Sequence, residues 1–295
     1  MTCYPPEGLL PLLKYPGGKR TLLPFYSAYL PADLHTRRFV EPMCGGMAAS
    51  LVWASKFESV HVCDANVALM QCYQGLIHGD ALDRIEFEAA RYNASTNKEG
   101  VFYTWRMHVN DDPAAFWLVN RTTFNGLVRY NSSGGFNSPW GKVKHISQEM
   151  LSRLRETVEL LRTAASPQSA VLRGAFTLHP PVGVQEFCTS FAWREGDIAF
   201  FDPPYHGGFT AYTPGGFGLE DQAALAVEVA RLGEVLGVQC FVSNADHPAI
   251  RKLYEGVLTP VEVDAAKMIS RKAQTRGKKT ELFLVPAEAS KSHWI

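Results

Sequence analysis

Residues 39–51, "FVEPMCGGMAASL", carry the pattern that is most informative about the architecture of the chain. It has the order of a buried strand, a glycine turn and a helix. Gly45 and Gly46 let the backbone approach a ligand, and the helix N-terminus behind them favours polar or anionic groups. Asp64 closes the next predicted strand 19 residues after Gly45, where a doubly wound fold places an acid that binds ribose hydroxyls. The pattern indicates a site for a nucleoside-containing ligand.

The rest of the chain alternates short apolar runs with helical patterns, which predicts an α/β fold with a parallel sheet and helices on both faces. The predicted strands are residues 37–42, 59–66, 170–176, 197–204, 238–244, 256–264 and 281–286. The clearest predicted helices are residues 47–57, 65–79 and 219–237. Residues 267–280 read as a polar loop between the last two strands.

Residues 80–167 do not follow this alternation of strands and helices, which predicts an inserted domain. Helical stretches lead into "NRTTFNGLVRYNSSGGFNSPWGKVKH", which is dense in Asn, Gly, Ser and aromatic residues and carries turn signals. We expect a hairpin at about residues 120–145; it would present outward Phe124, Asn125, Arg129, Tyr130 and Trp140. Residues 1–79 and 168–295 would then form the catalytic and cofactor-binding domain. The alternative is an ordinary irregular subdomain.

Composition narrows the class of protein. The chain has 295 residues and is 46% hydrophobic, enough for a sizeable core. Its six cysteines form no CxxC pair and have no His at ligand spacing, which predicts reduced thiols and no metal site. It carries no long apolar window and no signal-peptide order, so we expect an intracellular, cytoplasmic protein that acts away from membranes.

The distribution of charge points to a polyanionic partner although the formal net charge is zero. Of the 29 lysines and arginines, 13 fall in three windows that contain no acid, residues 8–32, 113–148 and 265–280. If the windows converge, they form a basic groove suited to a phosphate backbone. Taken singly, each window is better explained as a solvated loop.

"IAFFDPPY", residues 198–205, places an acid and two prolines where a buried strand ends. The prolines fix φ and remove two amide donors, leaving the Asp202 carboxylate and the Pro203 carbonyl as rigid acceptors for an amino group. Tyr205 adds a flat face on which an extruded base can stack. A proline-stiffened turn explains the prolines but not the acid. Because no GxGxxG or GKS/GKT motif is present, S-adenosylmethionine fits better than NAD or ATP.

Seven motifs together resemble the Dam-type, class α, DNA N6-adenine methyltransferases. They are "KYPGGKR", "FVEPMCGGMAASL", "VCDAN", "NRTTFNGLVRYNSSGGFNSPWGK", "DPPYHGGFTAYT", "FVSNADH" and "SRKAQTRGKKTELFLV", in the family's order. The resemblance implies a Rossmann-like methyltransferase sheet with an inserted DNA-recognition domain. The implied cofactor-binding residues are Tyr15, Lys19, Glu41, Pro42, Gly45, Asp64, Phe176 and Asp202. The implied catalytic residues are Asp202, Pro203, Pro204 and Tyr205.

The same resemblance implies double-stranded DNA as partner, read by Lys14 and by the hairpin. Phe124 would wedge into the base stack, and Arg129 would read a guanine. The full implied DNA-binding set is Lys14, Phe124, Asn125, Leu127, Arg129, Asn137, Pro139, Lys142, Arg271, Arg276, Lys278 and Lys279. The chain departs from the family pattern in the cofactor loop, where Met43 replaces a common phenylalanine and Met47 a further glycine, and at Val143, which replaces a tyrosine near the DNA. The segment "HGG" between Tyr205 and "FTAYT" is also shorter than in many members of the family.

These observations lead to one functional hypothesis and two alternatives. We expect a monomer that transfers a methyl group directly from S-adenosylmethionine to N6 of a flipped adenine in a short, GATC-like site on host or phage DNA. The enzyme alternative is methylation of cytosine N4 or of adenine in RNA. The alternative from another class is a DNA-binding protein without catalysis.

Overall fold

A computed structural model describes residues 9–15, 18–131, 133–164, 175–207, 216–264 and 280–289. Its centre is a seven-stranded sheet of order β3-β2-β1-β4-β5-β7-β6. The strands are β1 (Arg38–Glu41), β2 (Ser59–Val62), β3 (Phe176–Leu178), β4 (Ile198–Phe201), β5 (Gln239–Ala245), β6 (Thr259–Asp264) and β7 (Thr280–Val285). The predicted α/β fold is confirmed.

The direction of one strand differs from the fully parallel sheet that the sequence suggested. β1 runs parallel to β2 and β4, β2 to β3, and β4 to β5. β7 is antiparallel to both of its neighbours, β5 and β6. Alternation of apolar runs with helices predicts parallel strands only where a helix makes the crossover. β7 instead pairs directly with the strand that precedes it, β6, and runs in the opposite direction.

Helices cover both faces of the sheet because alternate residues of each strand point to opposite sides. Phe200 of β4 packs on the side of α1 (Leu23–Ser27), α2 (Ala48–Trp53) and α3 (Val67–His78). Its neighbours Ala199 and Phe201 pack on the side of α8 (Val184–Ser190), α9 (Leu219–Leu236) and α10 (Pro248–Leu253). β4 is buried throughout, so the acid that follows it stands at the edge of a closed core.

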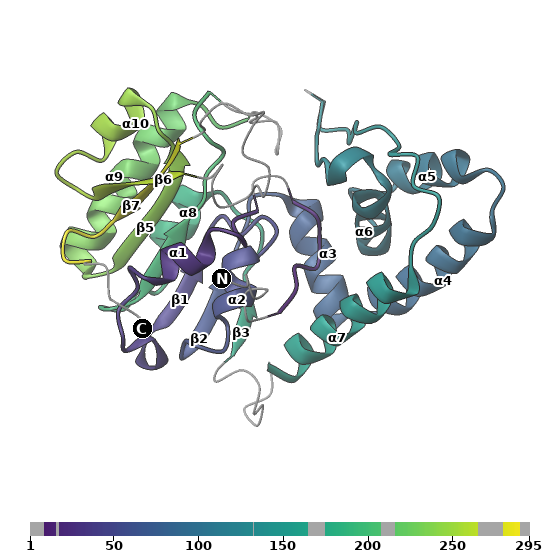
Figure 1. Ribbon diagram of the computed structural model, residues 1–295, viewed down its shortest axis with the longest axis horizontal. Coiled ribbons are helices and arrows are strands. Elements are labelled where there is room, and N and C mark those ends of the chain that lie inside the picture. The colour runs from purple at the N-terminus through teal and green to yellow at the C-terminus, as the bar shows by residue number, and fades with distance from the viewer. Residues whose placement is uncertain are drawn as a thin grey trace.

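In the described part of the chain between β2 and β3, further helices lie beside α3 (Figure 1). They are α4 (Ala81–Ala94), α5 (Lys98–Met107), α6 (Pro113–Thr122) and α7 (Gln148–Ala164), and α6 packs on α3. None of the helices in the described ranges is both long and apolar enough to cross a membrane.

Between α6 and α7 the chain folds back on itself with little regular pairing. A short 3-10 helix, η2 (Phe124–Gly126), is followed by two isolated bridges, Thr123 to Trp140 and Tyr130 to Phe136. The outward orientation predicted for Tyr130 is wrong: its ring is buried and its hydroxyl donates to Asn66 Oδ1 at 3.2 Å. Trp140 is half-buried, and its Nε1 donates to the Tyr92 hydroxyl at 3.1 Å.

Candidate active site

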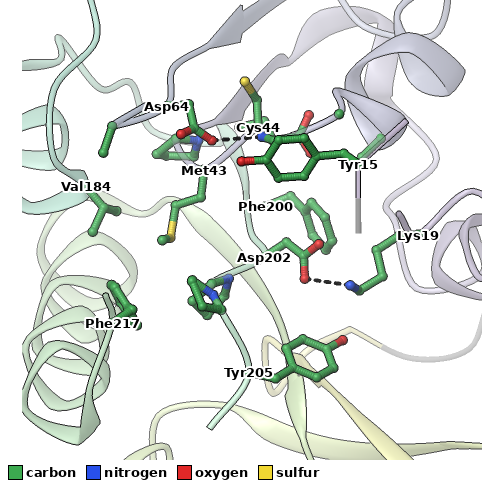
Figure 2. Close-up of a pocket in the computed structure, with 18 of the residues that line it drawn as sticks. Tyr15, Lys19, Met43, Cys44, Asp64, Val184, Phe200, Asp202, Tyr205 and Phe217 are labelled. Carbon is green, nitrogen blue, oxygen red and sulfur yellow. Dashed lines mark hydrogen bonds and ion pairs between the residues drawn. The ribbon is translucent and has the colours of Figure 1, made fainter. Parts of the chain in front are cut away.

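A cavity of about 440 Å³ opens at the carboxyl ends of β1, β2 and β4. Its lining includes ten residues that the sequence or the resemblance singled out: Tyr15, Lys19, Glu41, Pro42, Gly45, Asp64, Asp202, Pro203, Pro204 and Tyr205. Figure 2 shows Val184 and Phe217 on the side of the cavity opposite Tyr15 and Lys19. Phe176 begins β3 beside Val60 and lies outside the lining found in the described part of the chain.

Asp64 fixes the glycine turn on one side of the cavity. Its Oδ2 accepts a hydrogen bond from the Gly45 amide at 2.9 Å, and its Oδ1 accepts one from the Asn66 amide at 2.9 Å. Burial raises the pKa of the Asp64 carboxyl, while these two hydrogen bonds act in the opposite direction. The Tyr73 hydroxyl donates to the Gly45 carbonyl at 2.6 Å, so both polar groups of Gly45 are held.

Tyr15 lies directly over this turn, and the two glycines make that approach possible. A Cβ on Gly46 would stand 2.8 Å from Tyr15 Cβ, and one on Gly45 would stand 3.0 Å from Tyr15 Cδ1. Gly45 also has a φ of 44°, a left-handed conformation that side chains disfavour. Met47 adopts a φ of 53° at the start of α2, and its side chain is buried.

Glu41 ends β1 as a buried carboxyl. Its Oε2 accepts a hydrogen bond from the Ser50 amide at 3.1 Å and another from the Ser50 hydroxyl. Burial raises the pKa of Glu41 to about 8, and the nearby charges of Asp202 and Asp64 act in the same direction. This shift favours the protonated form of the Glu41 carboxyl in the folded protein at neutral pH.

Asp202 follows β4 and is held from two directions. Lys19 Nζ lies 2.9 Å from Asp202 Oδ1, and the Ser243 hydroxyl donates to the same oxygen at 2.5 Å. Lys19 Nζ also lies 4.6 Å from the centre of the Tyr205 ring (Figure 2). The Tyr205 hydroxyl donates to Glu281 Oε2 at 2.8 Å, which fixes the ring at the mouth of the cavity.

The hairpin residues expected to read DNA form one local cluster. Arg129 donates from Nε to Asn137 Oδ1 at 2.7 Å and from a terminal nitrogen to the Asn137 carbonyl at 3.1 Å. Phe124 exposes 56% of its surface although it is aromatic. The remaining members of the cluster are exposed or half-buried: Asn125, Leu127, Pro139 and Lys142.

Asn120 joins this cluster to the segment that carries Lys14 and Tyr15. Its Oδ1 accepts from the Lys14 amide at 3.0 Å, and its Nδ2 donates to the Lys14 carbonyl at 2.7 Å and to the Gly126 carbonyl at 3.4 Å. The approach is close, since a Cβ on Gly126 would stand 2.5 Å from Lys14 Cβ. Lys14, which is exposed, therefore lies beside the hairpin.

Two cations of the acid-free windows are engaged within the protein, and the third window lies almost wholly outside the described residues. Lys19 is buried with Asp202, and Arg121 donates to the Leu12 carbonyl at 2.9 Å. Burial lowers the pKa of Arg121 to about 10. Lys19 and Arg121 therefore bind groups of the protein itself. Four predicted phosphate contacts lie outside the described residues: Arg271, Arg276, Lys278 and Lys279.

Sequence reasoning missed several residues that shape the site. Ser243 and Gln222 are buried polar residues whose side chains reach the "DPPY" segment, and Asn120 and Glu281 hold Lys14 and Tyr205. The available signal was weak. Ser243 stands one residue before Asn244 at the end of an apolar strand, where α/β proteins place ligand contacts.

Comparison with known proteins gives the family. The model of the D12 class N6 adenine-specific DNA methyltransferases matches residues 15–171 and 182–276. The chain belongs to this family. It is therefore an adenine-specific DNA methyltransferase, and the resemblance drawn from its motifs is confirmed.

Relatives of this methyltransferase match over nearly their full length. A DNA adenine methylase of Vibrio cholerae is 31% identical over 285 residues, covering 92% of this chain and 94% of that protein. The DNA adenine methylase of Escherichia coli K12 is 29% identical, covering 92% and 93%. A type II methyltransferase, M.CviBI, of a Paramecium bursaria Chlorella virus is 26% identical, covering 84% and 87%.

Proposed function

We propose that the cavity binds S-adenosylmethionine and that the methyltransferase uses it to methylate N6 of an adenine turned out of duplex DNA. One observation carries the proposal. Asp202 lies between the nucleoside side of the cavity, formed by Gly45 and Asp64, and the aromatic face of Tyr205. A nucleoside donor and a flipped base can therefore both reach the same carboxylate.

The residues on the donor side suit a nucleoside that carries no phosphate. Asp64 offers carboxylate oxygens to ribose hydroxyls, and Tyr15 offers an aromatic face to the donor's adenine. When bound, S-adenosylmethionine supplies an activated methyl group on a positively charged sulfur. The glycine turn lets the backbone approach that donor, because neither Gly45 nor Gly46 could carry a side chain beside Tyr15.

In the reaction, residues of this chain activate the adenine amino group, which is a poor nucleophile. The lone pair of the adenine amino group is delocalised into the ring, so the nitrogen must be polarised. Hydrogen bonds from N6–H to the Asp202 carboxylate and the Pro203 carbonyl favour localisation of the lone pair, and the carboxylate stabilises the developing positive charge. Tyr205 stacks on the base and aligns it. The product sheds its proton readily, so no separate general base is required.

Recognition of the DNA sequence is assigned to residues 80–167 as an inserted recognition domain, together with Lys14. Arg129, held by Asn137, is oriented to contact guanine O6 and N7, and Leu127 and Pro139 suit thymine methyl groups. The exposed Phe124 would fill the space that the flipped adenine leaves. A GATC-like site is consistent with this set. The protein would act as a monomer inside the cell, where its DNA substrate lies.

The decisive experiment measures transfer of labelled methyl groups to unmethylated duplex DNA, followed by nucleoside analysis and modification-sensitive sequencing. We expect N6-methyladenine at one short motif. Asp202→Ala should abolish turnover, and Asp202→Asn should lower the rate by at least about a hundredfold, because both remove the negative charge that stabilises the transition state. Asp80→Asn, at an exposed helix terminus, is the matched control and should retain full activity.

Two results would contradict the proposal. N4-methylcytosine among the product nucleosides would support the alternative base specificity. Wild-type protein that binds both S-adenosylmethionine and DNA without any transfer would support a DNA-binding role instead. Near-normal methylation by Asp202→Ala would leave the function intact but would refute the part given to the carboxylate.

A further inference from the structure

The end of β5 carries two consecutive polar residues, Ser243 and Asn244, whose side chains are both completely buried. Neither belongs to the lining of the cavity. Because successive residues of a strand point to opposite sides, the two side chains can reach different parts of a neighbouring segment. That segment is "DPPY", which leaves the adjacent strand β4.

Ser243 determines which oxygen of Asp202 faces the substrate. Its hydroxyl donates to Oδ1 at 2.5 Å, and Lys19 Nζ lies 2.9 Å from that same oxygen. Neither of these bonds uses Oδ2. A carboxylate held through one oxygen has its plane and its second oxygen fixed in direction, so Oδ2 is the acceptor that remains for an amino group.

Asn244 holds the other end of the segment through Gln222 of α9. Asn244 Nδ2 donates to Gln222 Oε1 at 2.9 Å, and Gln222 Nε2 donates to the Pro204 carbonyl at 2.8 Å. Asn244 Oδ1 accepts from the His206 amide at 3.3 Å. The backbone is thus tied on both sides of Tyr205. The Pro204 carbonyl is already engaged, which assigns the Pro203 carbonyl as the second acceptor for the adenine.

We propose that Ser243, Asn244 and Gln222 are positioning residues for methyl transfer, which rests on the function proposed above. Ser243 directs Asp202 Oδ2 toward adenine N6. The Asn244–Gln222 pair fixes the backbone position of Pro203 and Tyr205 relative to Asp202. None of the three touches a substrate. Misplacement of a reacting group by about 1 Å can cost about a hundredfold in rate, so loss of either support slows the chemical step while binding is retained.

The test compares single-turnover methylation, with enzyme in excess and both substrates saturating, among four variants. Ser243→Ala removes the hydroxyl, Ser243→Thr restores it, and Gln222→Met keeps the shape of the side chain without its hydrogen bonds. Cys240→Ala is the matched control, since it removes a buried sulfur atom from the same strand away from the site. Dissociation constants for S-adenosylmethionine and DNA and a thermal unfolding curve accompany each rate.

We expect Ser243→Ala and Gln222→Met to lose about tenfold or more in single-turnover rate, with both dissociation constants within about threefold of wild type. Ser243→Thr should recover most of the rate, and Cys240→Ala should keep it. A wild-type rate in Ser243→Ala, or losses that follow thermal stability equally in all four variants, would overturn the inference. Absence of methyl transfer by the wild-type protein would instead refute the proposed function.

Discussion

The buried carboxyl of Glu41 predicts an unusual dependence of stability on pH. Burial raises its pKa from 4.5 to about 8, with Asp202 and Asp64 adding to the effect. Between these two values the folded protein holds a proton that the unfolded chain has released. The free energy of unfolding therefore falls as pH rises, because the unfolded state binds fewer protons than the folded state.

The size of the effect follows from the same two pKa values. Proton linkage lowers the contribution of Glu41 to the free energy of unfolding by about 2 kcal/mol between pH 6 and pH 8. Glu41→Gln keeps an oxygen that can accept from Ser50 and cannot titrate, so its stability should be flatter over this interval by about that amount. Urea unfolding of the protein without cofactor, followed at pH 6, 7 and 8, measures the difference.

The comparison between variants isolates Glu41 from other groups that titrate in the same range. All other ionisable side chains are shared by the wild type and Glu41→Gln, so only the difference between their pH profiles is interpreted. Glu58→Gln controls for the substitution itself, since Glu58 is exposed. Parallel pH profiles for wild type and Glu41→Gln would refute the reasoning and show that Glu41 is ionised in the folded protein.

Three further predictions concern other parts of the molecule. Asn120→Ala leaves both backbone groups of Lys14 without their partner and should weaken binding of cognate DNA about tenfold in fluorescence anisotropy; unchanged affinity would show that Asn120 has no part in placing Lys14. Gly46→Ala puts a Cβ 2.8 Å from Tyr15 Cβ and should weaken the binding of S-adenosylmethionine about tenfold, as measured by calorimetry. Wild-type affinity in this variant would show that the position of Tyr15 does not affect binding of the donor. Burial lowers the pKa of His61 from 6.5 to about 4, so unfolding takes up a proton in this range and stability falls as acid is added. His61→Gln should flatten that fall in urea unfolding between pH 6.5 and pH 4, and an unchanged slope would contradict it.

The predictable part of this protein is the part whose chemistry lies within a few residues of a strand end. Gly45, Asp64 and Asp202 could be placed because parallel strands bring their carboxyl ends to one edge, whatever the details of packing. The fold-back between Thr123 and Trp140 could be anticipated because the segment between them is rich in turn residues. Local sequence thus identified the position of the cavity and the candidate residues that surround it.

The rest depends on contacts between distant segments, which no local pattern reveals. Tyr130 turned inward because its hydroxyl finds Asn66, 64 residues away in the chain. Ser243 reaches Asp202 across 41 residues; the sequence marked the end of its strand but did not indicate which side chain Ser243 would contact. The antiparallel direction of β7 likewise follows from which strand it pairs with, and its apolar sequence suits either direction.

The charges around the cavity suit a donor that loses a positive charge in the reaction. Besides Glu41, the described lining of the cavity holds four acidic side chains, Asp64, Asp202, Asp221 and Glu281, and the ammonium of Lys19. Burial raises the pKa of Glu41 to about 8, which favours its neutral form. We expect this excess of acidic groups to attract the sulfonium of S-adenosylmethionine, but not the neutral sulfur of its product. If Glu41 were ionised as well, the cavity would hold the cationic donor more tightly without bringing it nearer the transition state.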